Sequence, residues 1–202
     1  MSAFPPPSRK TVPAHDGFLP AAAGDVRAHS FDSRHMVPLL ESPAAQCRHL
    51  FTIAVRVVKD LDDSHLALEP KSGLKTAGWL IGHLAVTGDF ARRLLGRVDA
   101  VCPKDWRERF NPGTKPSLRR EDYPSMEELR SAFLRVYEEL PEAASRAPDA
   151  AMARENPYEP AARPFPRAGD FTGYLLSGHF AYHVGQLTAW RVGAGLPALG
   201  AE

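Results

Sequence analysis

Two histidines four residues apart, His179 and His183, carry the strongest sign of chemistry in this sequence. Residues at positions i and i+4 lie one above the other on a helix, so both imidazoles can reach one metal ion. Leu175, Leu176 and Leu187 repeat on the same helical face, which predicts that both histidines point into the core. Because such a pair also arises by chance, its place on an apolar face is what gives it weight.

His83 offers a third nitrogen from a different segment, on an apolar stripe that runs from Trp79 to Leu94. Three neutral imidazoles from two facing helices form a metal site with a fourth position open to water or substrate. Such ligands suit zinc, nickel, copper or ferrous iron. From spacing alone a second interpretation stays open, in which each histidine is a core residue with its own hydrogen-bond partner. Burying three imidazoles without partners would cost roughly 1–3 kcal/mol for each unpaired polar atom.

The prolines show which segments can form the helices that carry these histidines, because proline disrupts a helix interior. Four long windows contain no internal proline and none of the apolar–polar alternation typical of a strand. They are Pro43–Pro70, Pro70–Pro103, Pro124–Pro141 and Pro166–Pro197. The sequence therefore predicts an all-α fold with four helices, which suits a four-helix bundle.

Signals at the helix ends support this interpretation. Serine, proline and glutamate favour helix starts, and glycine favours helix ends. The signals are Ser42-Pro43 before the first helix, Gly96 after the second, Ser125 and Glu128 at capping-box spacing before the third, and Gly193 and Gly195 after the fourth. The long connection Arg97 to Tyr123 is rich in proline, glycine and charge, and we expect it to cross the bundle or cover one end.

The amino-acid composition argues against several classes of protein and of binding partner. The 202 residues carry a net charge of +1, which gives no electrostatic reason to expect nucleic acid or an anionic membrane. Two cysteines, Cys47 and Cys102, are too few for a disulfide scaffold. Phe171 to Trp190 lacks Asp, Glu, Lys and Arg, but its polar residues indicate a buried helix rather than a membrane span. We therefore expect a cytoplasmic protein.

The chain is predicted to hold one folded domain. Residues 1–37 are rich in proline, alanine and glycine and lack a helical period, which predicts a disordered N-terminal extension. Residues 38–200 would form the helical bundle.

Three motifs resemble those of the DinB-like superfamily. Trp79-Leu80-Ile81-Gly82-His83-Leu84 is similar to the family's first histidine motif. The stretch Gly178-His179-Phe180-Ala181-Tyr182-His183-Val184-Gly185-Gln186-Leu187 resembles its second motif, His-x-x-x-His-x-Gly-Gln-Leu. Tyr123 to Leu129 resembles the usual entry into the third helix. The resemblance covers about residues 38 to 200.

The resemblance implies a four-helix bundle of up-down-down-up order with a long connection between helices two and three. It also implies a divalent metal, often zinc or nickel, held by three histidines that correspond to His83, His179 and His183. Family activities include low-molecular-weight-thiol S-transfer, thiol-dependent isomerisation and metal-dependent hydrolysis, and homodimers are frequent.

We therefore expect a metal-dependent enzyme that activates water or a thiol against a small molecule, with no nucleic acid or membrane partner. Gln186 is expected to orient a ligand or to pack as a helix amide, and Tyr182 to donate a proton or to pack against a helix or dimer partner. Trp79 would form the pocket wall. The alternatives are a non-catalytic bundle held by a structural metal and a metal-free stress-response module.

Other charged residues are interpreted as solvated surface. Asp89, six residues after His83, is expected to be a cap or a surface ion pair. The pairs Arg92-Arg93 and Arg119-Arg120 lie among acidic residues, which predicts self-neutralised surface charge rather than an anion-binding site.

Overall fold

The fold of this protein, a computed structural model, is described for residues 39–71 and 73–199. In those ranges every regular element is a helix, and one isolated bridge between Glu155 and Arg167 is the only strand-like pairing. The prediction of an all-α fold is confirmed. The predicted N-terminal extension, residues 1–37, lies outside the described residues.

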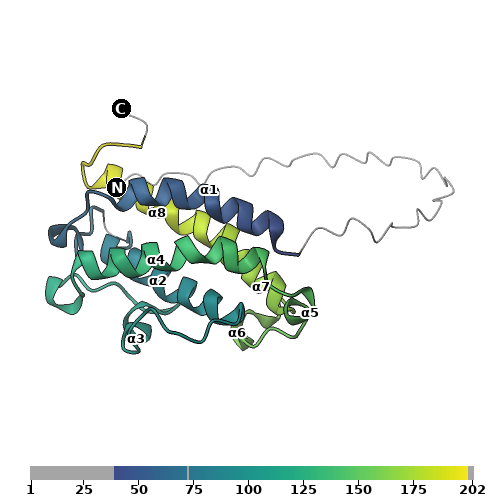
Figure 1. The fold of residues 1–202 in the computed structure, drawn as a ribbon. Coiled ribbons are helices and arrows are strands. Elements are labelled where there is room, and N and C mark those ends of the chain that lie inside the picture. The colour runs from purple at the N-terminus through teal and green to yellow at the C-terminus, as the bar shows by residue number, and fades with distance from the viewer. Residues whose placement is uncertain (1–38, 72, 200–202) are drawn as a thin grey trace, which may run out of the picture. The chain divides into compact units, whose positions relative to one another are not determined.

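Four long helical stretches dominate the structure (Figure 1). Three are single helices: α1 (Glu41–Val58), α2 (Ala77–Leu94) and α4 (Met126–Ser145). The fourth is continuous in space and consists of α7 (Ala168–Tyr174), a π-helical turn η4 (Leu175–His179) and α8 (Phe180–Gly193). In Figure 1, α2 and α4 run in one direction, and α1 and the α7–α8 stretch run in the other. Helix α4 packs against α1 and α2, and α8 packs against the same two helices.

Most of the helix ends follow the predicted signals. The Ser125 hydroxyl accepts a hydrogen bond from the Glu128 backbone while the Glu128 carboxylate accepts one from the Ser125 backbone, so the capping box is present. Gly96 and Gly195 adopt φ of +91° and +77° just after α2 and α8. Residues with a Cβ rarely adopt this left-handed conformation, which explains why glycine stands at both ends.

Two helix boundaries and the interior of the fourth helix differ from the prediction. Helix α1 begins at Glu41, two residues before Pro43, because first-turn amides need no intrahelical acceptor and a proline there costs little. Helix α4 continues through Pro141 to Ser145, since Leu140, Pro141 and Ala144 are all buried and packing holds the last turn in place. The fourth helix contains the π-helical turn, which ends at His179.

Asp89 and Arg92 on α2 form a buried ion cluster, so the prediction of a surface position is wrong for both residues. Both side chains are only 1–2% exposed, and Arg92 contacts the carboxylates of Asp89, Asp99 and Glu139 at 2.8–3.0 Å. Because the guanidinium binds three carboxylates, burial of the charge is compensated. Arg119 and Arg120 do pair with surface acids, as predicted.

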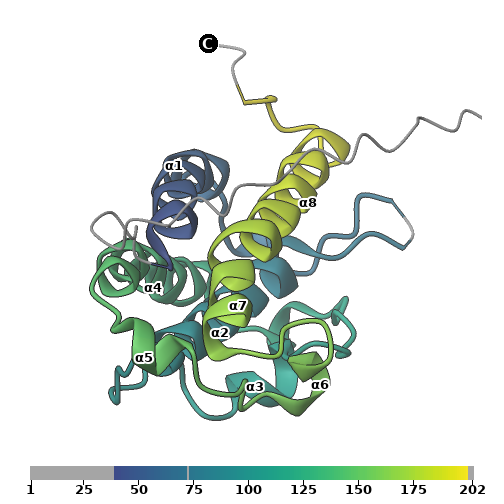
Figure 2. The same ribbon diagram turned by 90° about the vertical axis from the view of Figure 1, so that its right-hand side faces the viewer.

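The connections between the long helices carry short helices. They are α3 (Trp106–Phe110) and η3 (Arg120–Asp122) in the first connection, and α5 (Asp149–Met152) and α6 (Glu159–Ala162) in the second. Of these, α3 packs against α2 and α5 packs against α7. A short turn, η2 (Asp63–His65), follows α1. Figures 1 and 2 place α3 and α6 on the side of the molecule opposite α1.

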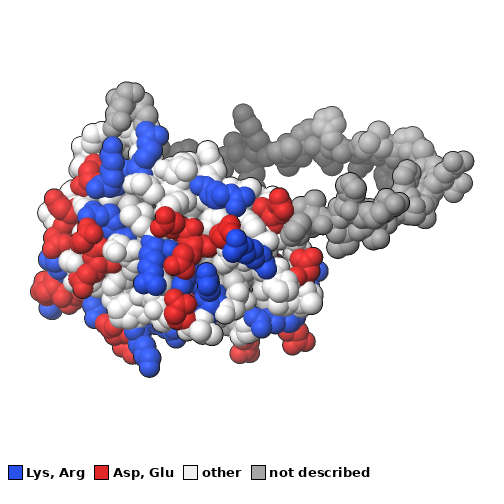
Figure 3. Space-filling model, in the orientation of Figure 1, with Lys and Arg blue, Asp and Glu red and all other residues white. Residues whose placement is uncertain are grey.

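Two further observations concern the surface. None of the helices that the structure describes has the length and apolar character needed to cross a membrane. On the face seen in Figure 3, basic and acidic side chains are interspersed.

Candidate metal centre

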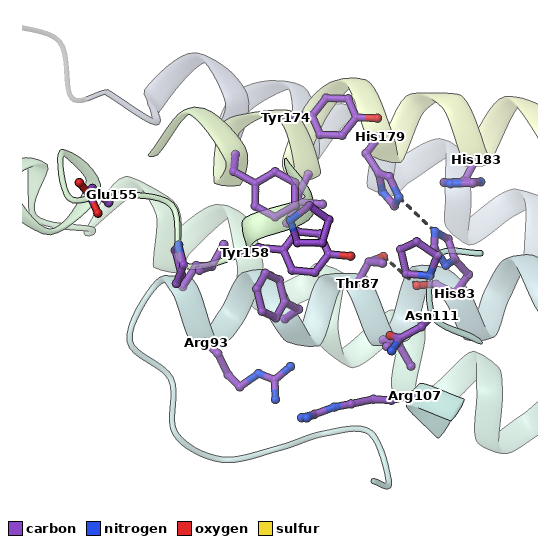
Figure 4. A pocket seen from close by; sticks show the side chains of 18 of the residues that line it. His83, Thr87, Arg93, Arg107, Asn111, Glu155, Tyr158, Tyr174, His179 and His183 are labelled. Carbon is purple, nitrogen blue, oxygen red and sulfur yellow. Dashed lines mark hydrogen bonds between the residues drawn. The ribbon is translucent and has the colours of Figure 1, made fainter. Parts of the chain in front are cut away.

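His83 on α2, His179 at the end of the π-helical turn and His183 on α8 meet inside the protein (Figure 4). Each offers a ring nitrogen, and these nitrogens all lie within 4.8 Å of one another. The Nε2 atoms of His83 and His179 are 3.1 Å apart. Two nitrogens bound to one tetrahedral zinc at 2.0–2.1 Å would lie about 3.4 Å apart, so the spacing is close to that of a shared ion. All three side chains are buried.

The orientation of His83 is fixed by α3. Its Nδ1–H donates to the Phe110 carbonyl at 2.7 Å, which leaves the Nε2 lone pair facing the other histidines. Phe110 can come so close because residue 82 is glycine: a Cβ there would lie 2.7 Å from the Phe110 ring. The Trp79 ring stacks on the imidazole with centroids 4.6 Å apart and planes 8° from parallel.

His183 is oriented by a chain of two side chains on its own helix. Its Nδ1–H donates to Gln186 Oε1 at 2.7 Å, and Gln186 Nε2 donates to the Tyr182 hydroxyl at 3.0 Å. This bond again leaves Nε2 free for a metal, the arrangement that metal-binding histidines commonly show. Gln186 therefore orients the histidine, and the Tyr182 side chain, 62% exposed, lies outside the cavity lining.

His179 supplies the evidence that hydrogen bonds within the protein do not satisfy the cluster. Its Nδ1 is buried and has no hydrogen-bond partner among the described residues. If His179 Nε2–H donated to His83, the Nδ1 lone pair would stay unpaired, and nothing described would donate to His183 Nε2. A cation bound by the three Nε2 lone pairs satisfies these three atoms together, with Nδ1–H of His83 and of His183 donating to Phe110 and Gln186. The buried Nδ1 of His179 has no described partner in either case. The donor set therefore fits a divalent metal.

The electrostatics keep these rings in the metal-binding form. Burial lowers the pKa of His83 to about 4 and the pKa of His179 to about 3. Burial also lowers the pKa of His183, and the nearby ammonium of Lys75 lowers it further. At neutral pH the three imidazoles are neutral, with lone pairs available to a cation.

Within the described residues no fourth histidine, cysteine or acidic side chain joins the cluster. Burial raises the pKa of Cys47 and of Cys102 to about 12, so neither thiol ionises near neutral pH. The fourth side of the cluster instead opens on a cavity of about 1070 Å³, which the three histidines and Trp79 line. A site with three protein ligands and an open position is the arrangement of catalytic zinc sites.

Several cavity residues were not singled out from the sequence. The hydroxyl of Tyr158 forms no hydrogen bond with a described residue, and the side chain extends into the cavity toward Thr87 (Figure 4). Arg93 also lines the cavity, and it has no ion pair in the part of the chain that the structure describes. The prediction of self-neutralised charge is thus wrong for Arg93. Tyr158 lies in a proline-rich segment with no helical period, so the sequence offers no signal for it.

The fold and the site together define an all-helical protein in which three buried imidazoles meet at one cavity. The family model described as the DinB superfamily matches residues 46–187, which include all three histidines. This match covers more than half of the sequence, so the chain belongs to the DinB superfamily. No curated protein and no solved structure matches the chain significantly.

Proposed function

We propose that His83, His179 and His183 hold a divalent metal, zinc or nickel, and that the protein is a metal-dependent enzyme acting on a small molecule. The reaction would be hydrolysis or the transfer of a low-molecular-weight thiol. One observation carries the proposal: three neutral, buried imidazoles converge on the wall of a large cavity, and in the described part of the chain no fourth histidine, cysteine or carboxylate joins them.

The chemistry of the bound metal would be that of a Lewis acid, which lowers the pKa of a water or thiol toward neutrality. The protein's own groups position and shield this chemistry. Phe110 and Gln186 hold two of the rings in one tautomer. Trp79 covers His83, and Tyr158 offers a hydroxyl that can donate a hydrogen bond to a substrate in the cavity.

The arrangement of the long helices is also part of this proposal. The directions of the four long helical stretches support an up-down-down-up four-helix bundle, with the long connection between α2 and α4. A homodimer and a cytoplasmic location stay predictions of the sequence.

A spectroscopic experiment tests whether the fourth position is open. The protein is loaded with cobalt(II) in place of zinc, and the absorption spectrum is recorded while a small thiol such as 2-mercaptoethanol is added. We expect new sulfur-to-cobalt absorption in the wild type and in the control His49→Ala, whose side chain is exposed on α1. His183→Ala should lose both the cobalt spectrum and the response to thiol.

An unchanged spectrum in cobalt-loaded wild type would contradict the enzyme proposal. It would favour the alternative, a non-catalytic bundle in which the metal only joins α2 to α8.

A further inference from the structure

The cavity extends from the three histidines along α2, and its middle is apolar. Val86, Phe90 and Leu94 are spaced four residues apart on α2 and present one face to it. Phe171 and Tyr158 line the same cavity, and their rings stack with centroids 5.5 Å apart. These walls fit the apolar or aromatic body of a ligand rather than a chain of water molecules.

Two arginines line the cavity away from the histidines. In Figure 4, Arg93 from α2 and Arg107 from α3 point toward each other. Neither guanidinium forms an ion pair or a side-chain hydrogen bond with any residue that the structure describes. The Nε of Arg93 is buried and has no partner among residues 39–71 and 73–199, where this side chain contacts the Phe90 ring with the ring centroid 5.4 Å from Cζ.

Three acidic residues are already bound to another arginine and so are not free to neutralise Arg93. Asp89, Asp99 and Glu139 all bind Arg92, which lies next to Arg93 in sequence but faces the core. A third arginine, Arg154, lines the cavity and donates to the Leu94 carbonyl. The one acidic residue in the lining is Glu155, which Figure 4 places apart from Arg93 and Arg107.

We propose that this cavity binds an elongated organic acid, with its terminal oxyanion held by Arg93 and Arg107, its apolar body along α2, and its opposite end at the three histidines.

The physical reason lies in the partly buried guanidinium of Arg93, whose Nε has no described partner, and in the second positive charge that the exposed Arg107 places near it. Like charges that face one another repel, and a half-buried guanidinium nitrogen without a partner is costly. A carboxylate or phosphate satisfies both arginines, since the guanidinium fork binds such groups with two parallel hydrogen bonds. The apolar wall between the arginines and the histidines then selects an acid with an apolar chain or ring over a small inorganic anion.

Any reaction at the end of the acid that lies against the histidines would rest on the proposed function, but binding of the acid does not. The two can therefore fail separately. Binding is measured on metal-free and on metal-loaded full-length protein, so loss of the metal site alone leaves the acid site intact.

The test is calorimetric titration with four probes: octanoate, octyl phosphate, neutral octan-1-ol and short-chain acetate. We expect octanoate or octyl phosphate to bind at least about tenfold more tightly than octanol, and acetate to bind most weakly, because the site needs both the charge and the chain. Comparison of the first two probes shows which oxyanion the arginines prefer. Affinity should also fall as salt is added.

Arginine variants locate the oxyanion. Arg93→Met keeps the apolar stem and should weaken binding of the preferred acid about tenfold, as should Arg107→Met. The matched control is Arg97→Met, which removes the same charge from an exposed residue outside the cavity. Thermal unfolding of each variant checks that the fold is kept.

The inference is overturned if octanol binds as tightly as both acids, or if Arg93→Met and Arg107→Met bind them like Arg97→Met. A folded double variant that keeps the wild-type preference for acids over octanol would overturn it equally.

Discussion

Two oxygen atoms determine which ring nitrogens can face a metal in this protein. The Phe110 carbonyl accepts from His83 Nδ1, and Gln186 Oε1 accepts from His183 Nδ1. Each bond fixes the tautomer with its lone pair on Nε2, so both rings present a lone pair to the centre of the cluster. The Nδ1 of His179 lacks such a partner among the described residues, and its ring is held by contacts with His83, His183 and Tyr174.

Gln186→Leu tests this arrangement at the level of one side chain. Without the amide oxygen, His183 can rotate and change tautomer, and we expect zinc affinity to fall about 10- to 100-fold. Competition with a chromogenic chelator measures the change. Tyr182→Phe is the matched control, because it removes the outer hydroxyl and leaves the Gln186–His183 bond; its effect should be smaller. Equal affinities for Gln186→Leu and wild type would contradict this role.

For single residues, the helical periodicity of the sequence predicts which side chains face the core. His83, His179 and His183 lie on apolar stripes, and their positions followed from helix geometry. Arg93 could not be distinguished from Arg92, because both lie among the same acidic residues in sequence. Successive residues on a helix point about 100° apart, so Arg92 turns to the core carboxylates and Arg93 to the cavity.

At the scale of secondary-structure elements, the packing of α3 against α2 orients His83. Gly82 lets the Phe110 ring lie against the α2 backbone, and the Phe110 carbonyl then reaches His83. Gly185 belongs to the second histidine motif but has open space around its Cβ position. The two glycines thus have different roles, although each stands in a histidine motif.

Gly82→Ala should displace α3 and weaken the metal site. The added methyl would overlap the Phe110 ring, at a cost of about 1–3 kcal/mol in the free energy of unfolding, and zinc affinity should fall at least tenfold. Gly185→Ala should bind zinc like wild type and gain roughly 0.5–1 kcal/mol from helix propensity. Denaturant unfolding and chelator competition measure both effects. Equal zinc affinity in the two variants would contradict the role of α3.

A buried arginine on α8 ties this helix to the end of α1. Arg191 is 4% exposed, and it donates to the Val57 carbonyl and to both oxygens of Asp60, with Nη2 2.9 Å from Oδ2. The hydrogen bond from Arg191 holds the pKa of Asp60 below its usual range. This stabilisation is therefore present above the ordinary aspartate pKa and is lost as the pH falls through the lowered value.

Asp60→Asn should reduce the free energy of unfolding by about 1 kcal/mol at pH 7, a modest value because the carboxylate is 40% exposed and screened by water. The difference from wild type should be constant between pH 7 and pH 5 and shrink in more acidic solution. Glu142→Gln removes an exposed pair with Arg146 and should cost at most about 0.5 kcal/mol. A difference for Asp60→Asn that grows on acidification would contradict the assignment.

The elements themselves were largely predictable. Proline spacing and caps located α1, α2 and α4 because these signals act within a few residues. The passage of α4 through Pro141 depends on burial of Leu140 and Ala144 against other helices, which local sequence does not encode. The π-helical turn before His179 likewise has no local signature, although such turns are frequent at functional sites.

In the whole molecule, the site depends on segments that the sequence could describe only as connections. Arg107 and Asn111 come from the segment between α2 and α4, and Tyr158 comes from the proline-rich segment before α7. Neither segment has apolar periodicity, so the cavity they enclose could not be predicted. The long helices, in contrast, share a cluster of buried apolar residues that includes none of the three histidines.

Removing the metal should therefore lower stability without unfolding the protein. At a free metal concentration of 100 Kd, binding to the folded state adds about 2.7 kcal/mol to the free energy of unfolding. Chelation should remove this increment, seen as a fall in Tm, while the far-ultraviolet circular dichroism at 25 °C stays helical. Loss of helicity on chelation would mark a structural metal instead.

The most direct test of the account is the metal content of untagged protein after reconstitution with zinc or nickel and removal of free ions. We expect about one equivalent per chain in wild type and in His49→Ala, and almost none in His83→Ala or His183→Ala. A metal-free wild type, or a His83→Ala variant that is folded and fully loaded, would contradict the claim that these three histidines form a metal centre.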